Sequence, residues 1–333
     1  MRWVMPVRVT ADDVAKAAGV SRAMVSRAFT PGASVAVRKR EHVLRVAQTL
    51  GYRPNLIARG LTGQRTGLVA VVAGEISRPY EAWLLEHIVR VLSANGYQPL
   101  LLPAFRDANM TEMIDHALAF QVEGAIVAAG SVSRDIADRC QASGAPLVLI
   151  GRVLEKNGAD AVCCDNIKGM WQLVERLVKQ GRRRIAWLGG TADTFSDQER
   201  RQGVEEALAH YGLSLQVQRR GDFSLSSGVS EGLALLDSRL ALDAIMCAND
   251  AMALGVVEAA AQRGIKVPDD VAITGFDDVP GAAWGRCPLT TVRNPVNETA
   301  LEALRLLETR VHNPTCDNQV IRVGVTLVPR SSA

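Results

Sequence analysis

The 333-residue sequence has few of the residues that carry metal or redox chemistry. Its six cysteines are scattered without a C-x-x-C pair, so we expect reduced core thiols, with no metal site and no disulfide framework. Its five histidines are dispersed without paired acids, and G-x-G-x-x-G, G-K-[ST] and H-E-x-x-H are missing. We therefore expect no catalytic site and no cofactor. A nucleotide-using enzyme, suggested by Gly189-Gly190-Thr191, is the alternative.

Long apolar runs are also missing. No segment reaches the roughly 18 apolar residues of a membrane span, and Met1 to Thr10 lacks the apolar core of a secretory signal. We therefore expect a cytoplasmic protein without a membrane partner. The length and the 48% hydrophobic content predict two or three folded units.

Charge is distributed unevenly along the chain. Residues 1–66 hold 12 Lys/Arg against 3 Asp/Glu, a net charge of +9, whereas the remainder holds 26 against 32, a net charge of −6. A basic module joined to an acidic body is typical of a phosphate-binding headpiece. The sequence therefore favours nucleic acid as a partner of its first 66 residues.

Two short helices are predicted near the start of the chain. Thr10 can cap a helix that begins at Ala11, and Asp13 completes an acidic capping box. Gly19 should end this helix in the left-handed conformation, and Ser21 is placed to cap a second one. Two helices joined by so tight a turn indicate a helix-turn-helix.

The second helix has two different faces at 100° per residue. The face expected to pack carries Val25, Ala28 and Phe29. The other face is small, polar and cationic, and it consists of Ala23, Ser26, Arg27 and Thr30, with Arg22 and Met24 at its sides. Such a face suits a DNA major groove, where arginine can bond a guanine edge. The alternative is a packing unit with a solvated basic face.

A third helix is predicted from Val37 to Leu50, ending at Gly51. Its first turn is cationic, against the preference of the helix dipole, which indicates nearby phosphates or a solvated charge run. The residues expected in its buried face are Val43, Val46, Ala47 and Leu50, and those in the cationic turn are Arg38, Lys39 and Arg40.

The segment after Tyr52 reads as a weak helix. Asn55 can cap it, but it is shorter than the roughly 12 residues that an isolated helix needs, and Gly60 weakens it further. We expect this linker to fold only when something packs against it. An ordinary interdomain linker is the alternative.

From Gly67 onwards, apolar runs of strand length alternate with amphipathic helices. This pattern predicts parallel sheets covered on both faces, in two doubly wound α/β lobes. Strands are expected at residues 68–73, 98–102, 125–128, 147–150, 161–164, 185–188, 217–219, 244–247, 271–274 and 290–293, and helices include 80–94, 168–179 and 250–263.

Taken together, these motifs make the chain resemble the Lac repressor (LacI/GalR) family of bacterial transcription regulators along essentially its whole length. The headpiece and linker segments that carry the resemblance are Asp13 to Ser21, Val25 to Arg27, Leu50 to Asn55 and Ala58 to Leu61. Those of the body are Gly181 to Gly190, Ala248 to Gly255, Gly275 to Asp278, Pro288 to Val292 and Val328 to Ser332.

The resemblance implies a homodimer whose two headpieces read a near-palindromic operator. It divides the chain into a headpiece (1–54), a hinge (55–66) and a core (67–333) with a sugar-binding fold. One lobe would comprise 67–165 plus 294–325, and the other 166–293 plus 326–333. Its DNA-binding positions are Arg22, Ala23, Ser26, Arg27, Thr30, Asn55, Ala58 and Leu61, with Leu61 as a wedge in the minor groove. Thr30 replaces the usual asparagine.

The resemblance also implies a small-molecule effector between the lobes. Its expected ligands are Arg200, Asn249 and Asp277, with Phe223 stacking on the ligand and Tyr80 and Arg152 on the side of the first lobe. From the residues alone, the alternatives are that Arg200 is a solvated helix arginine, that Asn249 and Asp277 are helix or turn caps, and that Phe223 belongs to the core. Arg78, Arg152 and Arg200 together favour an anionic ligand such as a sugar acid.

The function expected is therefore a repressor of carbohydrate or sugar-acid genes that its effector releases from DNA. A co-repressed regulator, for example with a nucleobase-type ligand, and a solute-binding protein without a DNA role are the alternatives.

Overall fold

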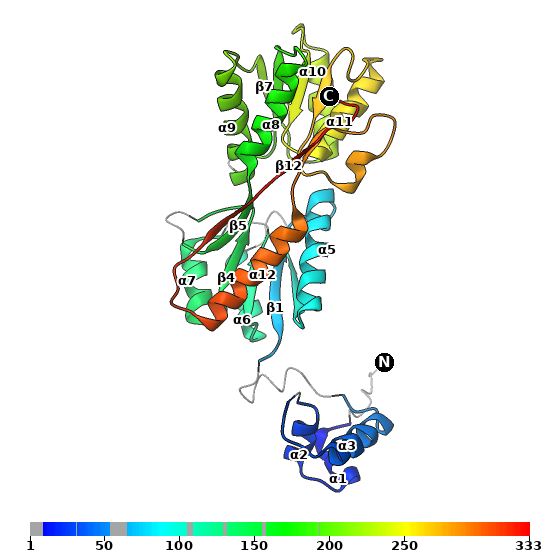
Figure 1. Ribbon diagram of the computed structural model, residues 1–333, viewed down its shortest axis with the longest axis vertical. Coiled ribbons are helices and arrows are strands. Elements are labelled where there is room, and N and C mark those ends of the chain that lie inside the picture. Colours follow the sequence, from blue (N-terminus) through cyan, green and yellow to red (C-terminus); the bar gives the residue numbers. More distant parts are fainter. Residues whose placement is uncertain are drawn as a thin grey trace. The chain divides into compact units, whose positions relative to one another are not determined.

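The computed structural model describes residues 9–30, 32–53, 65–104, 109–128, 132–154, 158–192 and 194–333. Its contacts divide the chain into two units, Met1–Thr66 and Gly67–Ala333 (Figure 1). Most of the predicted hinge, from residue 55 to 64, lies outside the described residues. Within the described ranges, no helix is both long and apolar enough to cross a membrane.

The first unit contains three helices, α1 (Ala11–Ala18), α2 (Arg22–Ala28) and α3 (Val37–Thr49). The predicted capping box is present, because Thr10 and Asp13 bond each other's backbone N–H groups. Gly19 ends α1 with a φ of 64°, and the hydroxyl of Ser21 accepts a hydrogen bond from Met24 N. The helix-turn-helix therefore begins and ends where its local signals predict.

The core of the first unit is small and apolar. Val14, Val25 and Val43 are at most 1% exposed, and α2 buries Val25 and Ala28 as predicted. The prediction that Leu50 is buried is wrong, because α3 ends at Thr49 and Gly51 turns the chain so that Tyr52 packs on this core instead. Val46 is only partly buried, against its prediction as a core residue.

The second unit contains two parallel sheets, each in its own lobe (Figure 1). The sheet of the first lobe has the order β11 (Val320–Val323), β5 (Asp160–Cys164), β4 (Leu147–Ile150), β3 (Gly124–Val127), β1 (Leu68–Ala73) and β2 (Gln98–Pro103). Its apolar side chains separate into one cluster under α6 (Met110–Ala119) and α7 (Arg134–Ala142) and another under α5 (Pro79–Ala94) and α12 (Val296–His312). Helices thus cover both faces of this sheet, as the sequence predicts.

The second lobe is built in the same way. Its sheet has the order β7 (Val217–Arg220), β6 (Ile185–Gly189), β8 (Ala244–Cys247) and β9 (Ala272–Thr274), and its helices are α8 (Asn166–Lys179), α9 (Phe195–His210), α10 (Leu225–Leu236), α11 (Asp250–Gln262) and the 3-10 helix η2 (Pro280–Ala283). An antiparallel pair, β10 (Thr291–Arg293) with β12 (Thr326–Val328), completes the unit.

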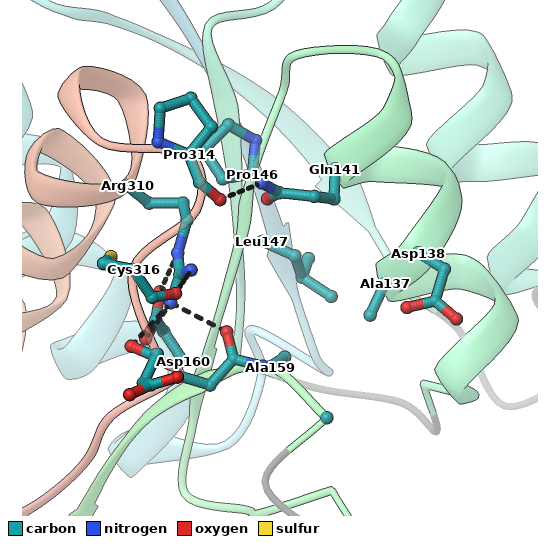
Figure 2. A pocket seen from close by; sticks show the side chains of 13 residues that line it. Ala137, Asp138, Gln141, Pro146, Leu147, Ala159, Asp160, Arg310, Pro314 and Cys316 are labelled. Atoms are coloured by element: carbon teal, nitrogen blue, oxygen red, sulfur yellow. Dashed lines mark hydrogen bonds and ion pairs between the residues drawn. The ribbon is translucent and has the colours of Figure 1, made fainter.

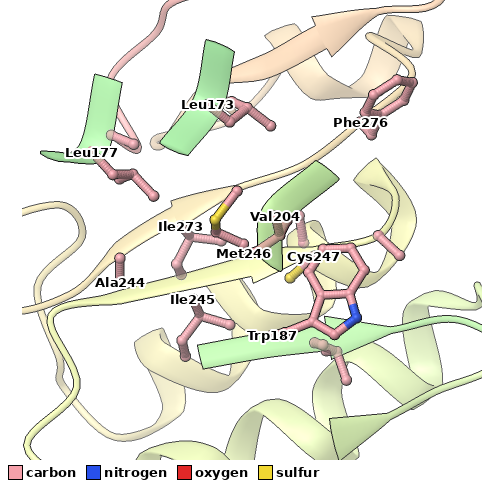
Figure 3. Packing of buried hydrophobic residues seen from close by; sticks show 14 of the residues in the cluster. Leu173, Leu177, Trp187, Val204, Ala244, Ile245, Met246, Cys247, Ile273 and Phe276 are labelled. Carbon is pink, nitrogen blue, oxygen red and sulfur yellow. The ribbon is translucent and has the colours of Figure 1, made fainter. Parts of the chain in front are cut away.

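A single apolar core lies between these elements of the second lobe. Trp187 on β6 is 1% exposed and packs in the cluster that includes Met246, Ile273 and Phe276 (Figure 3). The chain passes between the lobes three times, from β5 to α8, from β10 to α12 and from β11 to β12. Side chains near these passages are therefore in a position to respond to movement of the lobes.

All ten predicted strands are present, with ends within one residue. The sequence missed β11 and β12. Both are short and lie at edges, with residues that are at best half-buried, so neither has the continuous apolar run of the central strands. Each depends on a distant partner, since β11 pairs with β5 and β12 with β10.

Candidate functional site

The predicted DNA-contacting face of α2 is open to solvent. Ala23, Ser26 and Arg27 are exposed, and Arg22 has a 75% exposed side chain 3.9 Å from the carboxylate of Asp12. Thr30 is half-buried, and its hydroxyl donates to the carbonyl of Ser26 at 3.0 Å. A group outside the protein can therefore use this hydroxyl only as a hydrogen-bond acceptor. The face thus combines two small residues with two arginines, of which Arg27 donates from Nε to the carbonyl of Ala23 at 3.4 Å.

Arg40 has a structural role that the sequence did not predict. Its guanidinium donates to the carbonyls of Ala28, Thr30 and Ala33 at 2.9, 3.2 and 2.7 Å. A cation at the C-terminus of a helix also matches the helix dipole. Neither a phosphate contact nor a solvated charge explains Arg40, which instead fixes the turn that follows α2. Its neighbours Arg38 and Lys39 are exposed.

The three hinge residues expected to contact DNA, Asn55, Ala58 and Leu61, lie outside the described residues. Their roles stay predictions.

Arg200 on α9 is the centre of a buried polar cluster in the second unit. It is 4% exposed and donates to Asn166 Oδ1 at 2.9 Å, to the carbonyl of Ala248 at 2.6 Å and to Asp277 Oδ1 at 3.1 Å. Its guanidinium lies 3.8 Å from the centroid of the Phe276 ring. Arg200 is therefore not a solvated helix arginine, and its planar donors are fixed in direction.

Asp277 joins the two lobes through this cluster. It is 2% exposed, has a φ of 113°, and accepts from Arg200 and, at 3.3 Å, from Asn294 Nδ2. Asn294 also donates to the hydroxyl of Tyr80 on α5 of the first lobe, at 3.0 Å. Burial raises the pKa of Asp277, and burial together with the nearby Asp277 carboxylate raises the pKa of Tyr80. A hydrogen-bonded chain thus runs from α5 to Arg200.

Asn249 and Phe223 form a second contact at the strand ends of the same lobe. Asn249 caps α11 by accepting from Met252 N at 3.0 Å, and its amide donates to the carbonyl of Phe223 at 3.1 Å. Phe223 is half-buried with a φ of 67°, and its ring packs on Gly190, where an added Cβ would lie 2.1 Å from the ring. Asn249 thus is a cap, and Phe223 lies at the edge of the core.

Arg152 lies apart from these contacts, as the second residue after β4 in the first lobe. Its side chain is half-buried, and its Nε is fully buried without a hydrogen-bond partner among the described residues. Burial lowers the pKa of this guanidinium. The structure thus joins Arg200, Asp277 and Tyr80, joins Asn249 with Phe223, and leaves Arg152 without a direct contact to either group.

Arg78 does not contribute a free positive charge. Its Nε lies 3.1 Å from Glu75, and its Nη1 lies 4.0 Å from Glu81. Burial raises the pKa of Glu81 to about 7. The cationic cluster inferred from Arg78, Arg152 and Arg200 is therefore partly neutralised by carboxylates of the protein itself.

The sequence missed several residues of this region. Asn166 and Asn294 hold Arg200 and Asp277. Asn294 follows β10 directly and Asn166 is the second residue after β5, so an amide near the end of a strand was a usable signal. Arg322 on β11 bonds both carboxylate oxygens of Glu199 on α9, at 2.7 and 2.6 Å, and so ties the lobes together. No local pattern marks that pair, which is 123 residues apart.

Two cavities are lined by described residues of the second unit, one apart from the Arg200 cluster and one bordered by Asn294. One of about 240 Å³ is lined by the buried Arg310–Asp160 pair and by the segment around Cys316 (Figure 2). The other, of about 590 Å³, lies between Trp83, Arg293 and Glu298. Neither is lined by the predicted effector residues. Among the described residues, no group of His, Cys, Asp and Glu side chains could hold a metal ion.

Comparison with known proteins assigns both parts of the chain. Residues 10–55 match the bacterial regulatory proteins of the lacI family, and residues 174–333 match the periplasmic binding protein-like domain. The HTH-type transcriptional regulator CelR of Thermobifida fusca is 34% identical over 98% of each chain. The HTH-type transcriptional regulator DegA of Bacillus subtilis is 34% identical over 90% of each chain.

Solved structures agree with this assignment. The Lac repressor dimer bound to operator and the anti-inducer ONPF superposes with a TM-score of 0.88, at 25% identity, over 98% of this chain and 99% of that one. A complex of the regulator CelR with cellobiose gives a TM-score of 0.73 at 31% identity, over 98% of this chain and all of that one.

Proposed function

Because the chain belongs to the LacI family of bacterial regulatory proteins, and is thus a DNA-binding transcriptional regulator rather than an enzyme, we propose that it is a homodimeric repressor of carbohydrate or sugar-acid genes. A small-molecule effector releases it from a near-palindromic operator. The sugar bound by its relative CelR supports a carbohydrate-like effector.

The proposed operator contacts start at the exposed face of α2. Arg22 and Arg27 reach base edges or phosphates, and the small side chains of Ala23 and Ser26 permit close approach of the helix to the groove. Thr30 contributes an acceptor at the end of this face. Asn55, Ala58 and Leu61 extend the contact into the minor groove, where Leu61 wedges between base steps.

The proposed effector site is the group of side chains around Arg200. Arg200 and Asp277 bind effector hydroxyls, Asn249 adds an amide, and Phe223 stacks on the ring of the ligand. Tyr80 and Arg152 contribute from the first lobe.

One observation carries this proposal: the hydrogen-bonded chain from Tyr80 through Asn294 to the buried Asp277–Arg200 pair. An effector that takes over bonds of Arg200 or Asp277 changes the contact between the lobes. It therefore shifts the population of lobe arrangements, to which the hinge and headpiece respond.

Fluorescence anisotropy with a labelled inverted-repeat duplex tests the proposal on the full-length protein. We expect Arg27→Ala to weaken operator binding, and Arg200→Met to lose the response of operator binding to the effector. Arg201→Met is the matched control, because Arg201 follows Arg200 on the same helix but is 42% exposed.

Two results would contradict the proposal. Equal affinity for the inverted repeat and for a random duplex would contradict the proposal that the protein is a sequence-specific repressor. Tighter operator binding on adding effector would replace release by co-repression.

A further inference from the structure

We propose that Arg322 and Glu199 form a latch that holds the two lobes of the second unit together, and that Asn166 transmits the state of this latch to Arg200. The inference rests on the proposed function only in treating Arg200 as part of the effector site. It adds a conformational control that acts on the same cluster from within the protein.

The latch joins an edge strand of the first lobe to a helix of the second. Arg322 lies on β11, which pairs with β5 in the first sheet, and Glu199 lies on α9. Nη1 of Arg322 donates to Glu199 Oε2 at 2.7 Å, and Nη2 donates to Oε1 at 2.6 Å. Two parallel charge-assisted bonds fix both the distance and the orientation of the two planar groups. A rotation that separates α9 from β11 must therefore break this pair.

The latch is partly exposed to solvent. The side chain of Glu199 is 12% exposed, whereas that of Arg322 is 43% exposed. The guanidinium also lies 5.4 Å from the centroid of the Phe195 ring, one turn before Glu199 on the same helix. Breaking a partly solvated pair costs less than breaking a fully buried one. This latch can therefore open while both lobes stay folded.

Asn166 connects the latch to Arg200. It is the first residue of α8 and is 1% exposed. Its Nδ2 donates to Glu199 Oε2 at 2.9 Å, and its Oδ1 accepts from Arg200 Nε at 2.9 Å. Because an amide has one donor end and one acceptor end, the Glu199 carboxylate favours the orientation in which the acceptor end faces Arg200. Loss of Glu199 removes that support.

The hydrogen bonds continue from Arg200 back to the first lobe. Arg200 bonds Asp277, which accepts from Asn294, and Asn294 donates to Tyr80 on α5. The hydrogen-bonded chain therefore starts on β11 of the first lobe, enters the second lobe and returns to the first lobe at α5.

One member of this hydrogen-bonded chain lies next to each passage of the polypeptide between the lobes. Asn166 lies after β5, Asn294 follows β10, and Arg322 is the second-last residue of β11. A movement of the lobes about these passages changes the distances within the hydrogen-bonded chain. The latch and a ligand that bonds Arg200 thus act on one equilibrium between lobe arrangements.

Double electron–electron resonance on the full-length protein measures the latch. Nitroxide labels on p-acetylphenylalanine replace the exposed Asp135 of α7 and Ala209 of α9, one in each lobe (Figure 1). These labels leave the native cysteines untouched, and an excess of unlabelled subunits confines the measurement to one subunit of a dimer. We expect one narrow distance distribution for the parent protein. Glu199→Gln and Arg322→Met should each give a broader or doubled distribution.

Matched variants separate the latch from the loss of any ion pair. Glu231→Gln breaks the Arg219–Glu231 pair, whose side chains are 24% and 42% exposed on the Glu and Arg sides but which lies within the second lobe. It should leave the distribution as in the parent. Arg322→Lys keeps the charge without the two parallel bonds and should give an intermediate distribution. The double variant Glu199→Gln/Arg322→Met should match either single variant, since each alone removes the pair.

Hydrogen–deuterium exchange at the start of α5, residues 79–84, tests the link to Arg200, because Tyr80 is the last member of the hydrogen-bonded chain. Asn166→Ala keeps the latch but interrupts the link. It should leave the distance distribution close to that of the parent and speed this exchange about 3- to 10-fold, the size expected for one lost hydrogen bond. Glu199→Gln should change both measurements, and Glu231→Gln should change neither. The melting temperature identifies any variant that fails to fold, and the milder Arg322→Lys serves in that case.

The outcomes distinguish this inference from the proposed function. Distributions of Glu199→Gln and Arg322→Met that match the parent overturn the latch, as does equal broadening in Glu231→Gln. Broadening without faster exchange in α5 overturns the transmission through Asn166. Neither measurement uses DNA or an effector, so these results leave the proposed repressor standing. Equal binding of an inverted repeat and a random duplex would overturn the repressor and leave the latch standing.

Discussion

Replacing Arg200 with methionine tests the buried cluster through protein stability. The two side chains of the Arg200–Asp277 pair are 5% and 4% exposed. Methionine keeps an unbranched apolar stem but has no donor, so it leaves the Asp277 carboxylate buried without its cation. Breaking a buried ion pair from one side costs about 3–5 kcal/mol. We expect that loss in the free energy of unfolding at pH 8, measured by urea denaturation.

The loss should depend on pH. Burial raises the pKa of Asp277 above its ordinary value of 3.8, and Arg200 opposes that rise, so removing Arg200 raises the pKa further. A protonated Asp277 no longer needs a cation. The destabilisation by Arg200→Met should therefore be larger at pH 8 than at pH 5, because the further raised pKa lets Asp277 of the variant take up its proton more readily as the pH falls.

Two variants control this measurement. Arg201→Met removes an exposed arginine 3.9 Å from Glu205 and should change stability by at most about 0.5 kcal/mol. Adding Asp277→Asn to Arg200→Met should recover part of the loss, since it removes the uncompensated charge. An Arg200→Met protein within about 1 kcal/mol of the parent at pH 8 would refute this reasoning, as would a loss that is equal at both pH values.

Two further predictions concern other parts of the second unit. Burial raises the pKa of Glu81 from 4.5 to about 7, so the folded protein loses stability as the pH rises through this range. Glu81→Gln should therefore stabilise the protein by about 1–3 kcal/mol at pH 8 and by little at pH 4.5, as measured by urea denaturation. A gain in stability that is equal at both pH values would contradict this prediction. A Cβ at Gly228 would lie 2.3 Å from the carbonyl oxygen of Met252, so Gly228→Ala should destabilise by about 2–3 kcal/mol. Gly324→Ala, with no atom within 4 Å of the new Cβ, is its control, and equal melting temperatures would refute the clash.

Local signals made much of the fold predictable. The caps at Thr10, Gly19 and Ser21 act within a few residues, and each buried strand of the parallel sheets carries its own apolar run. The edge strands β11 and β12 lack such runs. The role of Arg40 was not predicted, because its acceptors are backbone carbonyls. Every residue type has such a carbonyl, so the sequence does not mark these partners.

The arrangement of the candidate site was predictable only in part. Motifs and strand ends singled out Arg200, Asn249 and Asp277 as candidates, but they could not show that Arg200 and Asp277 bond each other or that Asn249 is a cap. The link from Tyr80 to Asn294 joins residues 214 apart in sequence. Such a contact depends on how the two lobes pack against each other, and the hydrophobic periodicity of a sequence does not show that packing.

The buried and exposed faces of α2 have different roles, and this difference affects how the DNA sequence preference of such a headpiece can change. Val25 and Ala28 are fully enclosed, and Arg40 secures the end of the helix, so the outward positions contribute little to folding. Under the proposed mode of DNA contact, exchanges at Ala23 or Ser26 would alter the preferred promoter sequence while leaving the scaffold intact. A duplicated gene could thus acquire a new regulon by a few point mutations.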